Sequence, residues 1–547
     1  MRGSERNEDA ELAVGLTVPR VHASGTSAIR PAGTLAEGPT GPARPTTSLW
    51  WVEVALVAAM LSLAIAARRP GYLFSHAFWL DEGWVADSVR APLHQLRLLS
   101  SSTPIGWTLL LRLVPDIGPP ERLRFLPLLF GGLSVVAAYL LGRRLGRGAA
   151  VAAGLGAALA PTALRNHSLK QYSADAFVTL LLLWLTTRVE ARWTRGRLAA
   201  LCLVCIPALL VSHATLFVSA AVLGALAVRS LVERRWERLG WLVGLGAGVA
   251  AVATAVYLTF AATGNNDAMR RAWASSMLPV GDGLGPTVAV VAARFADVLG
   301  QVGFGPWPLA AAAVTAGLVS LWRSRLPATA AAVCLLAVEL VLAGATQRYP
   351  FLDDRTSLFF TSLLTVCGAL GVFTVLRWSA RRPLTIPLGV VAVSAGVLLV
   401  PAAYAQAMQP MPASTIRQQV SYVLAHRRPG DVIVVGPAAS FAFGYYWPER
   451  PTFVPATVRT AVLFEVDYPG NDDLVVVHQG RRPDLIHGAL REASARSSSG
   501  RVWLVLAEAG DRDPTWRQAS ARVGRIEHRH PGLVLIDGGE GPPSSGS

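Results

Sequence analysis

Long apolar segments separated by short, arginine-rich loops are the feature that most constrains how this chain can fold. The first, residues 50–67, has close to the roughly 20 residues that a helix needs to cross a hydrocarbon core about 30 Å thick. Ten more follow, at about 123–142, 148–164, 174–190, 198–212, 215–231, 239–262, 304–322, 327–345, 357–376 and 384–404. Hydrophobic residues make up 52% of the chain and charged residues 16%, unlike a soluble protein. We therefore predict a multi-pass α-helical membrane protein with about eleven transmembrane helices.

The loops predict the orientation of these helices. Arginines cluster in alternate loops, at 143–147, 188–197, 234–238, 323–325 and 377–382, as the positive-inside rule requires of the cytoplasmic side. This clustering accounts for the net charge of +15, so we exclude nucleic acid as a partner. Residues 1–47 mix Gly, Pro, Ser and both charges, which predicts a disordered cytoplasmic tail. The protein is then expected in the cytoplasmic membrane, with its N-terminus inside and the loops 68–122, 165–173, 263–303 and 346–356 outside.

The last part of the chain, residues 405–547, has a different pattern. Short apolar runs at 431–435, 474–478, 502–506 and 533–537 alternate with helix-like stretches at 416–427 and 484–495. This alternation predicts an extracytoplasmic α/β domain with a largely parallel sheet, following a transmembrane domain at 48–404. The domain has no nucleotide-binding glycine motif and no recognisable triad, so we assign it no chemistry.

Two adjacent carboxylates, Asp81 and Glu82, lie between Trp79 and Trp84 in the first external loop. Tryptophans favour the membrane surface, where a partly desolvated carboxylate can accept a proton from a hydroxyl. The alternative is that Asp81 caps a helix and Glu82 favours its positive end. The rest of this loop predicts two surface helices, one at 85–99 and one at 105–114, the second capped by Thr103.

Further polar residues gather in two other external loops. Lys170 is the only lysine among 50 basic residues, and an ammonium commonly binds a phosphate oxygen, although one lysine can also persist on a wet loop by chance. Asp175 could start a helix, act as a second acid or form an ion pair with Lys170 or Arg165. In the loop 346–356, Arg348 and Arg355 lie outside against the positive-inside preference, which suggests an anionic ligand. The acids beside them, Asp353 and Asp354, could orient these arginines, hold a divalent cation, or be surface and capping residues.

The order of these motifs resembles the GT-C superfamily of integral-membrane glycosyltransferases, in particular bacterial relatives of protein O-mannosyltransferase and aminoarabinose transferase. The matching pieces are Leu80-Asp-Glu82, Thr103-Pro-Ile-Gly-Trp-Thr-Leu-Leu-Leu111, Arg124-Phe-Leu-Pro127, Leu169-Lys-Gln-Tyr-Ser-Ala-Asp175 and Tyr349-Pro-Phe351 with Asp354-Arg355. They fall within residues 50–450. Where relatives often have His-Pro-Pro, this chain has Ser102-Thr-Pro104, so no metal ligand is assigned and a divalent cation remains an open possibility.

The resemblance implies inverting transfer of a sugar from a polyprenyl-phosphate donor to a glycan, lipid or protein acceptor outside the membrane. Asp81 would be the general base and Glu82 would orient the acceptor or tune Asp81. Donor binding would involve Lys170, Tyr172, Asp175, Arg348 and Arg355. Two rival functions stay open, a transporter or flippase of envelope precursors, for which the intramembrane Glu339 is also typical, and a non-catalytic envelope scaffold.

Overall fold

The computed structural model describes residues 48–99, 103–166, 168–262, 267–381, 386–409, 414–456, 464–478, 483–507 and 513–538. The chain divides into two compact units, 1–51 and 52–547. The predicted N-terminal tail, residues 1–47, lies outside the described residues.

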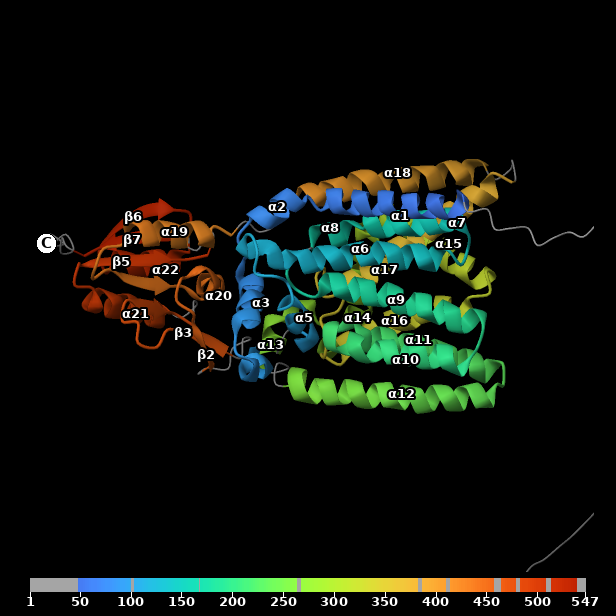
Figure 1. Ribbon diagram of the computed structural model, residues 1–547, viewed down its shortest axis with the longest axis horizontal. Helices are drawn as coiled ribbons and strands as arrows, with labels where there is room; N and C mark the ends of the chain where they lie inside the picture. The colour runs from blue at the N-terminus through green and yellow to red at the C-terminus, as the bar shows by residue number, and fades with distance from the viewer. Residues whose placement is uncertain are drawn as a thin grey trace, which may run out of the picture. The chain divides into compact units, whose positions relative to one another are not determined.

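A helix lies over each of the eleven predicted segments, and these helices run side by side in Figure 1. They are α1 (Ser48–Ala67), α6 (Phe125–Gly142), α7 (Arg147–Ala158) with α8 (Pro161–Arg165), α9 (Tyr172–Ala191), α10 (Arg195–Val211), α11 (Ala214–Val232), α12 (Trp236–Val256), α15 (Trp307–Arg323), α16 (Pro327–Ala345), α17 (Leu358–Ser379) and α18 (Ile386–Met408). Within the described residues, eight helical segments are long and apolar enough to cross a membrane. The other three predicted spans are α9, which carries charged residues in its first and last turns, and α10 and α15, which have 17 residues each.

The central helix of the bundle is α17, which is buried along most of its length. It packs very closely on α15: a side chain on Gly317 would begin 1.9 Å from the carbonyl oxygen of Cys367. Small residues allow such close helix contacts in membranes, where the hydrophobic effect does not drive helix association. The loop that carries Arg355 leads directly into this helix, so Arg355 is attached to a rigid part of the bundle.

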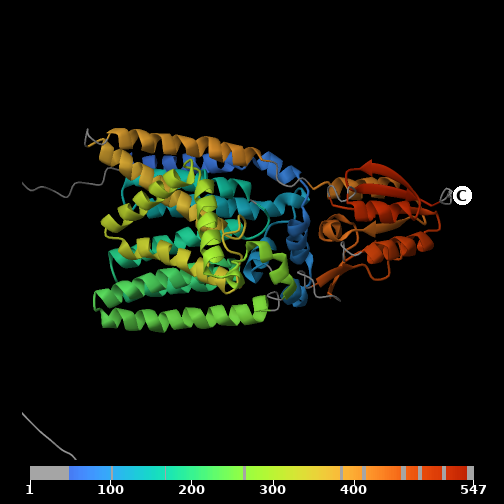
Figure 2. The same cartoon turned by 180° about the vertical axis from the view of Figure 1, so that it is seen from behind.

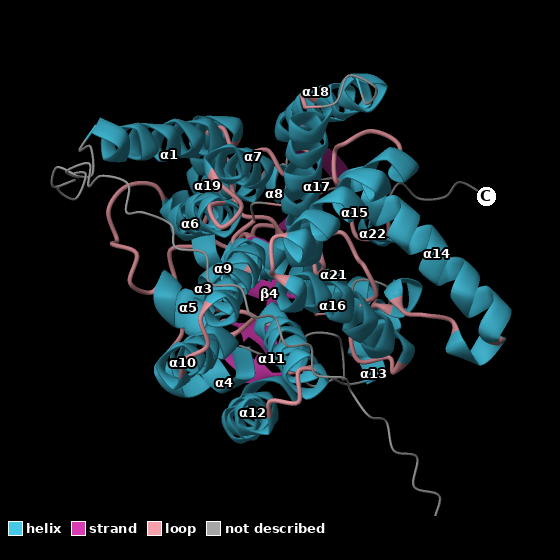
Figure 3. Cartoon of the chain, turned by 90° about the vertical axis from the view of Figure 1, so that its right-hand side faces the viewer, coloured by secondary structure: helices cyan, strands magenta, loops and turns pink. Residues whose placement is uncertain are grey.

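One of the predicted external loops contains more regular structure than expected. Residues 263–303 were expected to form a polar loop, but they contain α13 (Asp267–Ala272) and the long amphipathic helix α14 (Leu284–Gln301). Figures 2 and 3 show α14 lying across the long helices instead of along them. Its apolar residues pack against the bundle core through Val290, Val291 and Phe295, and this contact explains why the segment is helical.

The segment predicted as the first external loop, residues 68–122, contains α2 (Pro70–Ser75), α3 (Leu80–Arg90), α4 (Leu96–Leu99) and α5 (Ile105–Leu111). The surface helix predicted at 85–99 is interrupted after Arg90, because Pro92 cannot donate a helical hydrogen bond and restricts the residue before it. The second predicted helix corresponds to α5. Its capping residue is Pro104, so the expected Thr103 cap was wrong.

The C-terminal domain has a five-stranded sheet in the order β4 (Leu474–Val476), β1 (Val432–Val435), β5 (Arg501–Val505), β7 (Leu533–Asp537) and β6 (Arg525–His530). Strand β1 is parallel to β4 and β5, whereas β7 is antiparallel to β5 and β6, so the sheet is mixed and the expectation of a largely parallel sheet was wrong. Alternate residues of β1 belong to two separate hydrophobic clusters. On one face lie α19 (Ile416–His426) and α20 (Pro437–Tyr446), and on the other α21 (Pro483–Arg496) and α22 (Pro514–Ala521). A separate ribbon pairs β2 (Thr452–Pro455) with β3 (Phe464–Asp467).

The core of the C-terminal domain extends to the helices of the segment 68–122. Trp84 of α3 and Leu99 of α4 belong to the same buried hydrophobic cluster as Phe441 of α20 and Phe464 of β3. Trp84 packs against both phenylalanines, with ring centroids 5.8 and 5.4 Å apart. The helix that carries Asp81 and Glu82 is therefore held by the C-terminal domain as well as by the bundle.

Candidate active site

The acidic pair lies in the first turn of α3. The residue that caps this helix is Trp79, so Asp81 is not a capping residue, and no side chain makes a capping hydrogen bond there. Both carboxylates still lie near the positive end of the helix, where negative charge is favourable. Successive residues of a helix point in different directions, and this separates the surroundings of Asp81 from those of Glu82.

Glu82 is completely buried and forms a two-pronged ion pair with Arg124. Its Oε1 accepts a hydrogen bond from Arg124 Nε at 2.9 Å and another from the backbone amide of Leu169 at 2.9 Å. Arg124 also donates to the carbonyl oxygens of Leu73 and His76, at 2.7 and 2.5 Å. Such complete hydrogen bonding is what makes a buried ion pair tolerable. Glu82 thereby fixes the segment before Lys170 to the first turn of α3.

Asp81 lies at the meeting point of three segments that are far apart in the sequence. Its Oδ2 is 3.0 Å from Arg355 Nη1 and 3.4 Å from Lys170 Nζ. The Asp81 side chain is 21% exposed, compared with 0% for Glu82. One carboxylate oxygen of Asp81 therefore lies close to two cations, at a place that solvent can reach.

Aromatic rings surround the two cations. The ammonium of Lys170 lies 5.4 Å from the ring centre of Trp84. The guanidinium of Arg355 lies 5.8 Å from the ring of Trp79 and 5.6 Å from that of Trp273. Ring faces attract cations and reduce their contact with water, so each charge is stabilised without a second carboxylate.

The loop before α17 orients Arg355. Asp353 accepts hydrogen bonds from the backbone amides of Arg355 and Thr356, at 3.1 and 3.4 Å, in the manner of an Asx turn. The Tyr349 hydroxyl donates to the carbonyl of Thr356 at 2.7 Å. Asp354 points to other elements: it accepts from Gln301 at 2.9 Å, and one of its oxygens lies 3.6 Å from Arg165. Both acids thus hold the loop in place, and the described residues contain no group of three His, Cys, Asp or Glu able to hold a metal ion.

Three residues predicted for the site do not contact Asp81 directly. Tyr172 is buried at the start of α9, two positions after Lys170. Asp175 is buried one turn further along α9, where it accepts a hydrogen bond from the backbone amide of Ala214 at 3.5 Å, at the start of α11. Arg348 is exposed and forms no ion pair with any described residue.

Two residues close to the acidic pair, Arg124 and Trp273, are not among the predicted site residues. Arg124 was noted only as part of a motif at the start of a predicted span, and Trp273 lies in a loop with no recognisable pattern. A basic residue directly before a long apolar segment on the predicted outer side could have identified Arg124, since arginine is disfavoured there.

Comparison with known proteins shows which solved structures have a similar fold. No protein-family model and no curated protein matches the sequence. Among solved structures, ArnT from Cupriavidus metallidurans in its apo state is similar over 90% of this chain and 98% of its own, with a TM-score of 0.52 and 14% identity. ArnT bound to undecaprenyl phosphate gives 0.51 and 15% over the same shares of both chains.

A second similar protein is the Archaeoglobus fulgidus oligosaccharyltransferase in complex with Zn and sulfate, with a TM-score of 0.50 and 12% identity over 85% of this chain. In two structures of that protein, the chain spans 69% and 63% of its length. Both ArnT and this enzyme are GT-C membrane glycosyltransferases. The similarity confirms the predicted fold class, a multi-pass helical membrane protein with a C-terminal α/β domain that resembles ArnT.

Proposed function

We propose that this protein is an inverting glycosyltransferase that moves a sugar from a polyprenyl-phosphate donor to an acceptor hydroxyl outside the cytoplasmic membrane. The observation that carries the proposal is the convergence of Arg355 and Lys170 on Asp81, at 3.0 and 3.4 Å, from three separate segments. The similarity to ArnT bound to undecaprenyl phosphate supports a lipid-phosphate donor. The arginine-rich loops support an orientation with this site outside.

In this proposal the two cations exchange partners when the donor binds. Lys170 and Arg355 move from the Asp81 carboxylate to the phosphate oxygens, and this leaves Asp81 free to accept a proton. The acceptor oxygen bonds to the anomeric carbon as the bond from that carbon to the phosphate oxygen breaks. The electron pair stays on the phosphate, where preorganised cations stabilise the developing charge, and the hydroxyl proton passes to Asp81.

The remaining predicted residues have supporting roles in the proposal. Glu82 positions Asp81 and Lys170 through Arg124 and Leu169, without touching substrate. Tyr172 lines the site beside Arg355, and the exposed Arg348 meets the donor as it approaches. Asp175 holds α9 to α11 below the site.

The first test replaces Asp81 by asparagine, which keeps the shape of the side chain and removes its basicity. Transfer from an undecaprenyl-phosphate sugar by the purified protein is expected to fall about 10²–10⁴-fold, the usual contribution of positioned acid–base catalysis. Asp282→Asn is the matched control, an exposed acid in another loop of the predicted outer face. Asp81→Asn activity equal to that of the control would remove Asp81 from the role of base. Movement of the lipid across a vesicle without sugar transfer would favour a transporter.

The second test concerns the cations. Lys170→Gln and Arg355→Gln are each expected to raise the KM for the lipid-phosphate donor and to lower kcat, since both cations bind the phosphate more strongly as its charge develops. Arg427→Gln, in the C-terminal domain, is the control. Unchanged donor kinetics in both site variants would mean that these cations only hold Asp81 in place.

A further inference from the structure

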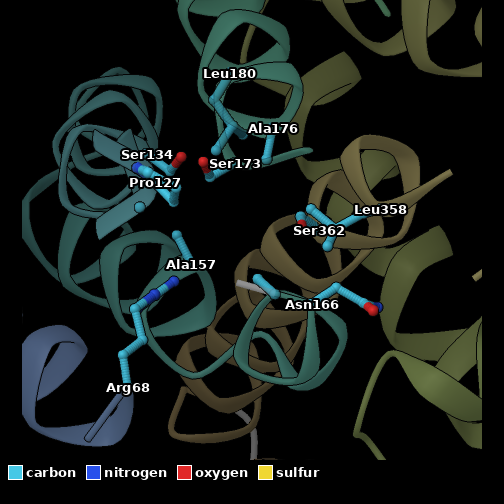
Figure 4. Close-up of a pocket in the computed structure, with 12 residues that line it drawn as sticks. Arg68, Pro127, Ser134, Ala157, Asn166, Ser173, Ala176, Leu180, Leu358 and Ser362 are labelled. Atoms are coloured by element: carbon cyan, nitrogen blue, oxygen red, sulfur yellow. The ribbon is translucent and has the colours of Figure 1, made fainter. Parts of the chain in front are cut away.

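A cavity inside the helix bundle contains a cation that the proposed reaction does not use. It is lined by residues of α6, α7, α8, α9 and α17 together with Arg68. Most of its lining is apolar, including Pro127, Ala176 and Leu358. The polar part consists of Arg68, Asn166 and three serines, which Figure 4 shows around the same space.

Arg68 is the unusual member of this lining. Its side chain is only 4% exposed, and its one hydrogen bond to a described residue runs from Nη1 to the carbonyl oxygen of Ala64, at 2.9 Å. No described carboxylate forms an ion pair with it. Burial lowers the pKa of Arg68 to about 10, so the group remains charged at neutral pH although its surroundings oppose the charge. A buried cation without a counterion is costly, and an anionic ligand would remove that cost.

The packing around Arg68 leaves space for its guanidinium. The side chain lies against Gly131 of α6, where any Cβ would come within 2.9 Å of Arg68 Nε. The arginine is therefore accommodated inside the bundle by the absence of a side chain opposite it. Arg69, its neighbour, is exposed and lies over the ring of Tyr72 instead.

Two hydroxyls in the same cavity also lack partners. Ser173 Oγ and Ser362 Oγ are both buried and form no hydrogen bond within the described structure. Buried hydroxyls are nearly always hydrogen-bonded, so these two donors are available to a group bound in the cavity. A tetrahedral phosphate can accept hydrogen bonds from a guanidinium and from hydroxyls at once.

We propose that this cavity is a phosphate-binding site in which Arg68 is the cation and Ser173 and Ser362 are further donors. The apolar lining around a single buried charge suits a phosphate that is attached to a lipid, the source we favour over free phosphate. The inference does not depend on the transferase proposal, because Arg68 makes no contact with Asp81, Lys170 or Arg355.

The experiment measures ligand-induced thermal stabilisation of the purified protein in detergent, with undecaprenyl phosphate in one arm and inorganic phosphate in the other. Both Lys170 and Arg355 are replaced by glutamine throughout, so that the proposed catalytic site contributes no phosphate binding. In this background the lipid phosphate should still raise the melting temperature, because a ligand that binds only the folded state stabilises it. Adding Arg68→Gln should raise the apparent Kd about ten- to a hundredfold, the usual loss for a hydrogen bond to a charged group.

Three further variants separate binding from folding. Arg69→Gln removes a neighbouring exposed charge and should leave the Kd unchanged. Arg68→Lys should restore part of the binding lost in Arg68→Gln. Gly131→Ala keeps the charge but displaces the guanidinium, so it should weaken binding even if Arg68→Gln does not fold. Stabilisation by both ligands supports a site for the phosphate group itself, and stabilisation by the lipid alone supports a lipid-phosphate site. No stabilisation by either ligand, or full binding by the Arg68→Gln and Gly131→Ala variants, would overturn the proposal.

Discussion

At the scale of single residues, Asp81 and Glu82 are neighbours in the sequence with different physical roles. Glu82 is fully buried in a satisfied ion pair with Arg124, whereas Asp81 is 21% exposed. Removing the charge of Glu82 leaves Arg124 buried without a counterion. We therefore expect Glu82→Gln to destabilise the protein by about 3–5 kcal/mol, and Asp81→Asn by no more than about 1 kcal/mol. Thermal unfolding of both variants in detergent tests this contrast, and equal losses of stability would contradict it.

Charged residues in polar loops on one predicted face could be selected from the sequence, whereas residues that matter through a buried partner could not. Asp81, Lys170 and Arg355 were selected as charged groups on one predicted face, and they meet. Arg124 is 42 positions from Glu82, a distance that no helical or strand periodicity connects. Arg68 was interpreted only as the end of the first span, since burial of an arginine depends on tertiary packing against Gly131.

At the scale of elements, the contact between α3 and α20 connects the acidic pair to the C-terminal domain. A Cβ on Gly83 would lie 2.5 Å from the backbone nitrogen of Ala442. Gly83→Ala must therefore push the two helices apart and shift Asp81. We expect kcat to fall about 10-fold to 100-fold with a smaller change in KM, because small displacements of a catalytic group are costly. Gly71→Ala, with open space around the new methyl group, is the control. Unchanged kcat in Gly83→Ala would show that α3 does not depend on this contact.

Elements were predictable where local sequence determines them. Long apolar runs gave the bundle helices, and apolar runs of about five residues gave β1, β4, β5 and β7. The strand β6, with the sequence Arg-Ile-Glu-His-Arg-His, has one apolar residue and is a strand because it pairs with β7. Its position at the sheet edge leaves polar side chains in water, so its sequence carries no burial signal.

At the scale of the whole molecule, the bundle and the C-terminal domain are joined through two buried acids that should respond to charge removal in opposite ways. Glu121 is buried and accepts from Arg417 at 2.9 and 3.0 Å and from the Tyr446 hydroxyl at 2.7 Å. That hydroxyl also accepts from the backbone amide of Phe78 at 2.9 Å. Asp87 of α3 is 1% exposed, and its Oδ2 has no hydrogen-bond partner where it faces Gly444 of α20.

The pH dependence follows from Asp87. Burial raises its pKa well above the ordinary value of 3.8, against the opposing charge of Arg90. The folded protein therefore holds the Asp87 proton more tightly than the unfolded chain does. As the pH rises from about 4 toward the pKa of Asp87 in the folded protein, only the unfolded chain loses this proton, so the stability that the protonated Asp87 contributes is lost. Asp87→Asn should remove that loss, raise the melting temperature at pH 7 to 8 and flatten its dependence on pH. Glu121→Gln should instead destabilise by about 1–3 kcal/mol, because Arg417 loses its counterion. Melting curves of both variants between pH 4 and 9 test this prediction. If both substitutions destabilise the protein, Asp87 is ionised and paired between α3 and α20, and the prediction is wrong.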